Sequence, residues 1–175
     1  MDSETARKDL LKIKEHIAAI TKQSTEANWL LKQPDRNMFG QEVAHLVRVM
    51  EDTVSRFRQA FEKPPANAKQ TAIALKLRRL KLQYVKSLKE SETMQELGTP
   101  DQPDLKDTFS KLRAAVSDLE DLNAKYPEPR MAVITSPHPL YGEFTLPEWI
   151  FYLKRLAQYT VDRLEHIIRF SPYGG

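Results

Sequence analysis

The sequence predicts an all-α fold, an up-down-down-up four-helix bundle with a long crossover that contains an extra helix. Four segments carry apolar residues at three- and four-residue spacing, which is typical of helices that bury one face. These segments cover residues 4–23, 37–62, 104–125 and 146–170. Their apolar stripes have matching lengths, as the members of one bundle require. Residues 63–103 separate the second long helix from the third, so we expect the crossover there.

The last helix has the clearest start signal. Thr145 and Glu148 match the capping box, in which the hydroxyl accepts from a backbone N–H and the glutamate accepts from the threonine N–H. Pro147 lies in the first turn, where a missing backbone donor costs nothing. At about 100° per residue, one narrow stripe faces inward. It contains Leu146, Trp149, Leu153, Leu156, Thr160, Leu164 and Ile167.

The other long helices also begin and end at local signals. The first begins near Ser3 and has its acidic residues early, as the helix dipole favours. The second ends before Pro64, and Gly40 is tolerable in its first turn. Asp104 is the expected N-cap of the third, which ends before Pro127.

Three remaining segments are expected to differ from the long helices. Residues 29–34 form a connector that ends at Pro34. Residues 126–144 hold four prolines and a glycine, which exclude a helix and predict a fixed connection. Residues 72–88 have mixed apolar spacing, and their Ala, Leu, Lys and Arg content favours a helix over a strand.

Length and composition limit the class of protein. With 175 residues and 41% hydrophobic content, the chain suits one domain over residues 1–175, which would bury about 70% of its unfolded surface. Cysteine is absent, which excludes disulfides, thiolate metal ligands and cysteine nucleophiles. No apolar run reaches the roughly 18 residues of a membrane span, and the charged N-terminus does not match a signal peptide. We therefore expect a cytoplasmic protein without a membrane partner.

The net charge of +3 conceals an asymmetry between two parts of the chain. Residues 69–89 carry seven Lys and Arg and no acid, so the remainder sums to −4. A basic helix that contains Tyr84 has the charge expected of a nucleic-acid binder. The favoured interpretation is a solvated face balanced by the acidic remainder, with binding to nucleic acid or an acidic partner as the alternative.

The segment from His138 to Trp149, HPLYGEFTLPEW, carries a family resemblance together with AHLVRVME in the second helix and TPDQPD before the third. It resembles the DinB/YfiT-like superfamily, in a branch of unknown function, over nearly the whole chain. The resemblance implies a four-helix bundle, often dimeric, in which three histidines bind a divalent metal. Characterised relatives include thiol-dependent transferases and isomerases. A metal-dependent thiol transferase or hydrolase-like enzyme is therefore an alternative function.

Only one of the three implied metal ligands is present. The first falls on His45, whereas the pair in the last helix falls on Leu156 and Thr160. Because one neutral imidazole does not hold a transition metal, we expect no metal and no cofactor, and we assign no catalytic residue. His45 also lies roughly 150° from the apolar stripe of its own helix, so an exposed or hydrogen-bonded histidine is as well supported as an inward one.

Other histidines and acids are interpreted as structural. Asp162 and His166 point outward, and a solvent-side ion pair is favoured over a shifted metal site. His16 is expected at the surface, and for His138 a structural role is favoured over acid–base work.

The remaining functional expectation is a degenerate DinB-like bundle that binds a small molecule or acts as a homodimeric interaction module. Aromatic residues at helical spacing are more often core than pocket, so they support this function only in part. The candidates for a pocket are His45, His138, Trp149, Tyr152, Leu156 and Thr160.

Overall fold

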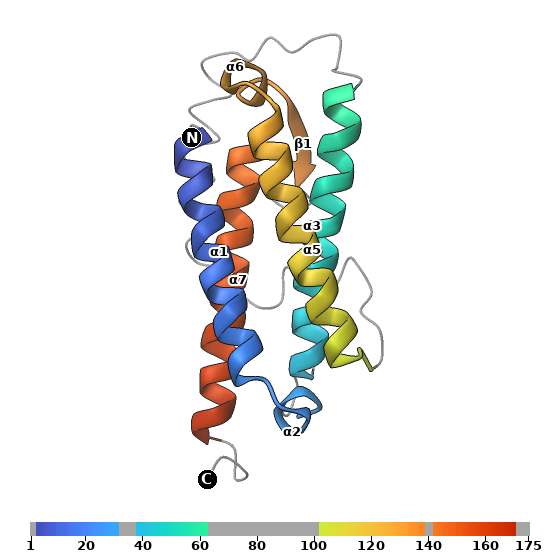
Figure 1. Ribbon diagram of the computed structural model, residues 1–175, viewed down its shortest axis with the longest axis vertical. Coiled ribbons are helices and arrows are strands. Elements are labelled where there is room, and N and C mark those ends of the chain that lie inside the picture. Colours follow the sequence, from blue (N-terminus) through green and yellow to red (C-terminus); the bar gives the residue numbers. More distant parts are fainter. Residues whose placement is uncertain (1–2, 32–37, 63–101, 139–141, 171–175) are drawn as a thin grey trace.

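The computed structural model is all-α apart from one small hairpin, and it describes residues 3–31, 38–62, 102–138 and 142–170 (Figure 1). Its four long helices are α1 (Ser3–Gln23), α3 (Phe39–Glu62), α5 (Leu105–Lys125) and α7 (Leu146–Phe170). Each boundary lies within two residues of the predicted one, so the four helices are confirmed. The extra helix expected over residues 72–88 lies outside the described residues.

The long helices run in two directions. Figure 1 shows α1 and α7 running one way and α3 and α5 running the other way. Ion pairs fix the register between neighbours: Asp9 near the start of α1 binds Lys154 near the start of α7. Glu42 at the start of α3 binds Arg163 near the end of α7. The α1–α7 pair is therefore parallel and the α3–α7 pair antiparallel.

Two predicted helix caps form as local contacts. The Asp104 side chain accepts from the Asp107 backbone N–H at 2.7 Å and begins α5. At α7, the Thr145 backbone N–H donates to the Glu148 carboxylate at 2.7 Å, as the capping box predicted. The Thr145 hydroxyl donates to the same carboxylate at 2.9 Å, a contact that the pattern did not predict.

The connectors contain more regular structure than the sequence indicated. A short helix, α2 (Glu26–Trp29), begins at a capping box made by Thr25 and Asn28. The expectation of no helix in residues 126–144 is wrong at α6 (Glu128–Met131), because Pro129 lies in the first turn, where no backbone donor is needed. The hairpin consists of the antiparallel strands β1 (Thr135–His138) and β2 (Gly142–Thr145).

The Trp29 indole closes the α2 end of the bundle. Its N–H donates to the Pro103 carbonyl at 2.7 Å, and its ring contacts Phe39 and Phe109. A Cβ atom added to Gly40 would lie 2.6 Å from the indole, closer than a real contact allows. Gly40 was predicted to be merely tolerable, but the packing of Trp29 requires glycine there.

Candidate functional site

The three positions implied by the family resemblance lie in the interior on α3 and α7. The Glu42–Arg163 ion pair sets the register of these antiparallel helices. His45 comes one turn after Glu42 on α3, and Thr160 one turn before Arg163 on α7, so both lie at one level of the antiparallel pair. Leu156 lies one turn before Thr160 on α7. All three positions are buried, with exposed fractions of 1% for His45, 5% for Leu156 and 1% for Thr160.

Of the two alternatives that the sequence left open for His45, the structure shows the inward one. Neither ring nitrogen has a hydrogen-bond partner among the described residues, and both are shielded from solvent. The first half of α3 is buried on nearly all of its faces. Its buried residues include Glu42, Ala44 and Val49, which lie on different sides of the helix. Burial, and secondarily the positive charge of Arg48, lowers the pKa of His45 to about 4. The imidazole is therefore neutral at pH 7.

The side chains at these positions do not fit a transition metal. Leu156 has no donor atom, and the Thr160 hydroxyl donates to the Leu156 carbonyl at 3.0 Å within its own helix. Within the described ranges, no three His, Cys, Asp or Glu side chains are grouped as metal ligands. A single imidazole beside leucine and threonine lacks the three nitrogen or oxygen donors that a catalytic zinc site needs.

The other three pocket candidates form an aromatic cluster where the hairpin meets α7. The His138 ring centroid lies 4.9 Å from that of Trp149 and 4.5 Å from that of Tyr152. The Trp149 indole N–H donates to the Ser136 carbonyl of β1 at 3.2 Å. Burial, and secondarily the charge of Arg56, lowers the pKa of His138 to about 4. These contacts are those of a packed core, and they favour the structural interpretation of His138.

Two further sequence interpretations are corrected at α7 and α1. Asp162 and His166 are exposed, as predicted, but the expected ion pair between them is not formed. Asp162 instead accepts from the Gln158 side chain at 2.7 Å, and the His166 ring packs on Phe170. His16 was expected at the surface and is half-buried, because α1 and α7 pack closely along their length.

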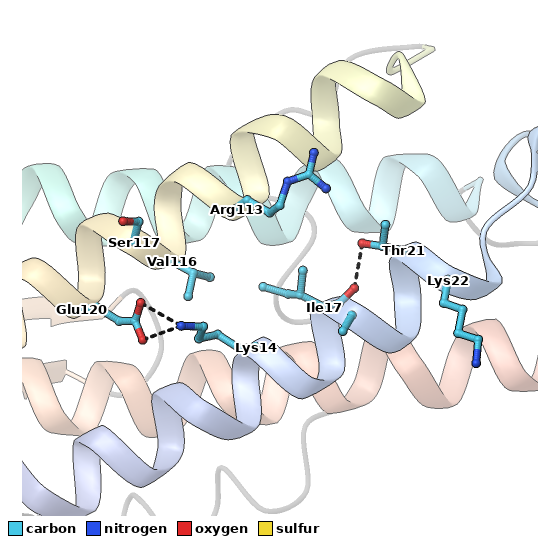
Figure 2. A pocket seen from close by; sticks show the side chains of 9 residues that line it. Lys14, Ile17, Thr21, Lys22, Arg113, Val116, Ser117 and Glu120 are labelled. Atoms are coloured by element: carbon cyan, nitrogen blue, oxygen red, sulfur yellow. Dashed lines mark hydrogen bonds and ion pairs between the residues drawn. The ribbon is translucent and has the colours of Figure 1, made fainter.

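A groove of about 630 Å³ lies on the surface between α1 and α5 (Figure 2). This volume is in the range of small-molecule sites, which is about 300–1,000 Å³. None of the six pocket candidates from the sequence lines it. Its lining residues are Lys14, Ile17, Ala18, Thr21 and Lys22 of α1 and Arg113, Val116, Ser117 and Glu120 of α5.

Small side chains leave the groove unfilled. Ile17 and Val116 are buried and form its apolar floor, while Ala18 and Ser117 are exposed beside them. A helix pair whose facing residues are this small cannot fill the space above the floor. The Thr21 hydroxyl donates to the Ile17 carbonyl at 2.8 Å, so its proton is already used in a hydrogen bond within α1.

The two ends of the groove differ in charge. At one end the Lys14 ammonium contacts both Glu120 carboxylate oxygens, at 3.0 and 3.2 Å (Figure 2). Arg113 lies at the other end, and Lys22, also at that end, points away from α5 in Figure 2. Within the part of the chain that the structure describes, neither of these two cations has an ion-pair partner. The Arg113 end is therefore positive and the Lys14 end neutral.

Sequence reasoning missed the groove because its residues lie beside the apolar stripes on faces that read as solvent-exposed. The available signal was weak: alanine and serine occur where α1 and α5 would otherwise place long polar side chains, at Ala18 and Ser117. No periodicity in either helix shows which neighbour this face meets.

Comparisons with known proteins add no family assignment. No protein-family model, no curated protein and no solved structure matches the chain. Among the helices formed by described residues, none is long and apolar enough to cross a membrane.

Proposed function

We propose that the protein binds a small organic molecule in the groove between α1 and α5. The observation that carries this proposal is a ligand-sized hollow with an apolar floor and a charged rim, open to solvent. Ligand sites typically combine an apolar lining with a few polar groups that orient the ligand. The interior positions His45, Leu156 and Thr160 are buried, so they are not open to a ligand that arrives from solvent.

A DinB-like bundle without metal chemistry is the family background that we propose for this binding function. The order and direction of the four long helices support it. The alternative of a metal-dependent thiol transferase is not favoured, because Leu156 and Thr160 do not supply ligands beside His45. Residues 69–89, on which the nucleic-acid alternative depends, lie outside the described residues. A cytoplasmic location remains part of the proposal.

A fluorescence titration with N-phenyl-1-naphthylamine tests whether the groove binds apolar molecules. This neutral dye brightens when it leaves water, and we expect saturable binding. Ala18→Phe should abolish it, because the ring would occupy the groove beside Ile17. Ala114→Phe is the matched control, since Ala114 is also an exposed alanine but does not line the groove. Equal binding by both variants would place the dye elsewhere and refute the proposal.

The same two variants test whether a second copy of the chain covers the groove. Light scattering coupled to size exclusion should give the same mass for the parent protein and both variants if the groove holds a small molecule. A dimer that Ala18→Phe alone dissociates, together with no dye binding by the parent protein, would assign the groove to a homodimer interface and overturn the proposal.

A further inference from the structure

We infer that the groove selects amphipathic anions, molecules with a carboxylate, sulfonate or phosphate head on an apolar body. This inference rests on the proposed binding function and names the chemical class of its ligand. The rim carries three cations, Lys14, Lys22 and Arg113, and one anion, Glu120. Because Lys14 and Glu120 neutralise one another across the groove, the remaining charge is concentrated at the Arg113 end.

Arg113 is the residue suited to hold the head group. A guanidinium is charged at every physiological pH and offers a planar set of donors that binds an oxyanion through two parallel hydrogen bonds. Its weak hydration also lowers the cost of exchanging water for a ligand. Lys22 points away from α5 (Figure 2), so it contributes long-range attraction and supports the C-terminal end of α1.

The opposite end of the groove sets the orientation of the ligand. Residues 14 to 22 of α1 span roughly 12 Å at 1.5 Å per residue, so the two polar ends are separated by about two helical turns. Ile17, Ala18 and Val116 lie between them and suit an apolar body of that length. The paired Lys14 and Glu120 leave no net positive charge to hold a second anionic group. The ligand therefore carries one anionic head, at Arg113, and an uncharged tail toward Glu120.

Two dyes with the same ring system separate the head-group contact from apolar binding. 8-Anilinonaphthalene-1-sulfonate carries a sulfonate, whereas N-phenyl-1-naphthylamine does not. We expect the sulfonate dye to bind the parent protein about tenfold more tightly, the gain typical of a hydrogen-bonded charge pair. Arg113→Gln should remove this advantage, so that the two dyes bind the variant with similar affinity. Arg169→Gln makes the same charge change at an exposed position outside the groove and should leave both affinities as they were.

The two hypotheses fail in different ways. Equal affinity of the two dyes for the parent protein, or equal losses of both dyes on Arg113→Gln, would overturn anion selection while leaving groove binding intact. Loss of neutral-dye binding through Ala18→Phe is the separate test of the groove itself. Displacement of the sulfonate dye by octanoate, octyl sulfate or octyl phosphate then identifies the preferred head group. Equal displacement by octanol would contradict a role for charge.

Discussion

The interior between α3 and α7 and the groove between α1 and α5 are both bounded by antiparallel helices, yet only the second of these two regions is open to solvent. In the interior, His45 of α3 and Thr160 of α7 are each 1% exposed. In the groove, the corresponding positions are the exposed Ala18 and Ser117 above a buried floor. The difference shows that side-chain volume, and not the direction of the helices, decides where this bundle is hollow.

The two regions also differ in how far their charged side chains are exposed to water. Glu42 and Arg163 are each 6% exposed in their side chains, so both have lost water and depend on one another. The Lys14 and Glu120 side chains are 52% and 37% exposed, and water screens their attraction. A charge in the interior must be paired, whereas a charge at the groove can remain available to a ligand.

The largest expected effect is on the filled side of the comparison, at Trp149. Trp149→Ala should lower the free energy of unfolding by about 3–5 kcal/mol, because the lost ring leaves a cavity among packed neighbours. These neighbours are His138, Phe144 and Tyr152. Thr145→Ala, which removes a hydroxyl and a methyl group at the start of α7, should cost about 1 kcal/mol. Urea melts that showed two equally mild effects would mean that the hairpin junction is loosely packed.

Gly40 tests whether the interior tolerates any added volume. Gly40→Ala should destabilise the protein by about 1–3 kcal/mol, since its Cβ atom would overlap the indole ring, which lies 2.6 Å away. In the double variant Gly40→Ala, Trp29→Leu, the alanine should cost less than it does beside tryptophan. Additive costs in thermal or urea unfolding would show that the clash is relieved elsewhere.

The pH dependence of stability tests how dry the interior is around His45. Because burial lowers the pKa of His45 from 6.5 to about 4, the folded protein binds fewer protons than the unfolded chain between these values. The contribution of the neutral His45 to the free energy of unfolding is present above pH 6.5 and is lost as the pH falls toward 4. Between pH 7 and pH 5 this histidine should cost about 2 kcal/mol.

Urea melts at these two pH values measure the effect, with His45→Leu as the variant that cannot titrate. Between pH 7 and pH 5, this variant should lose about 2 kcal/mol less stability than the parent protein loses. Identical losses in the two proteins would indicate that water reaches the imidazole and that this part of the interior is not closed.

The smallest expected effect belongs to the ion pair at the groove. A double-mutant cycle of Lys14→Ala and Glu120→Ala should give a coupling free energy of about 0.2–1 kcal/mol, as for other exposed pairs. High salt should weaken it further. A coupling as large as that of a buried pair would mean that this end of the groove is covered and would remove the contrast with Glu42 and Arg163.

Several local features could be predicted from the sequence because their causes lie within a few residues. The spacing of Leu10, Ile13 and Ile17 shows a helix with one buried face whatever it packs against. Asp104 caps α5 through a contact only three residues away. The candidate site was not predicted in this way. All six pocket candidates are buried, and none of them lines the groove.

The sequence by itself determined four amphipathic helices, their approximate ends and the burial of Trp149, since helical periodicity and capping act within a few turns. Only the tertiary structure decided that His45 is enclosed, that Gly40 must accommodate Trp29, and that Ala18 and Ser117 border a groove. Each of these depends on residues far apart in the chain, as the Lys14–Glu120 contact across 106 positions illustrates. A helix carries the pattern of its own faces, but the space between two helices exists only after both are packed.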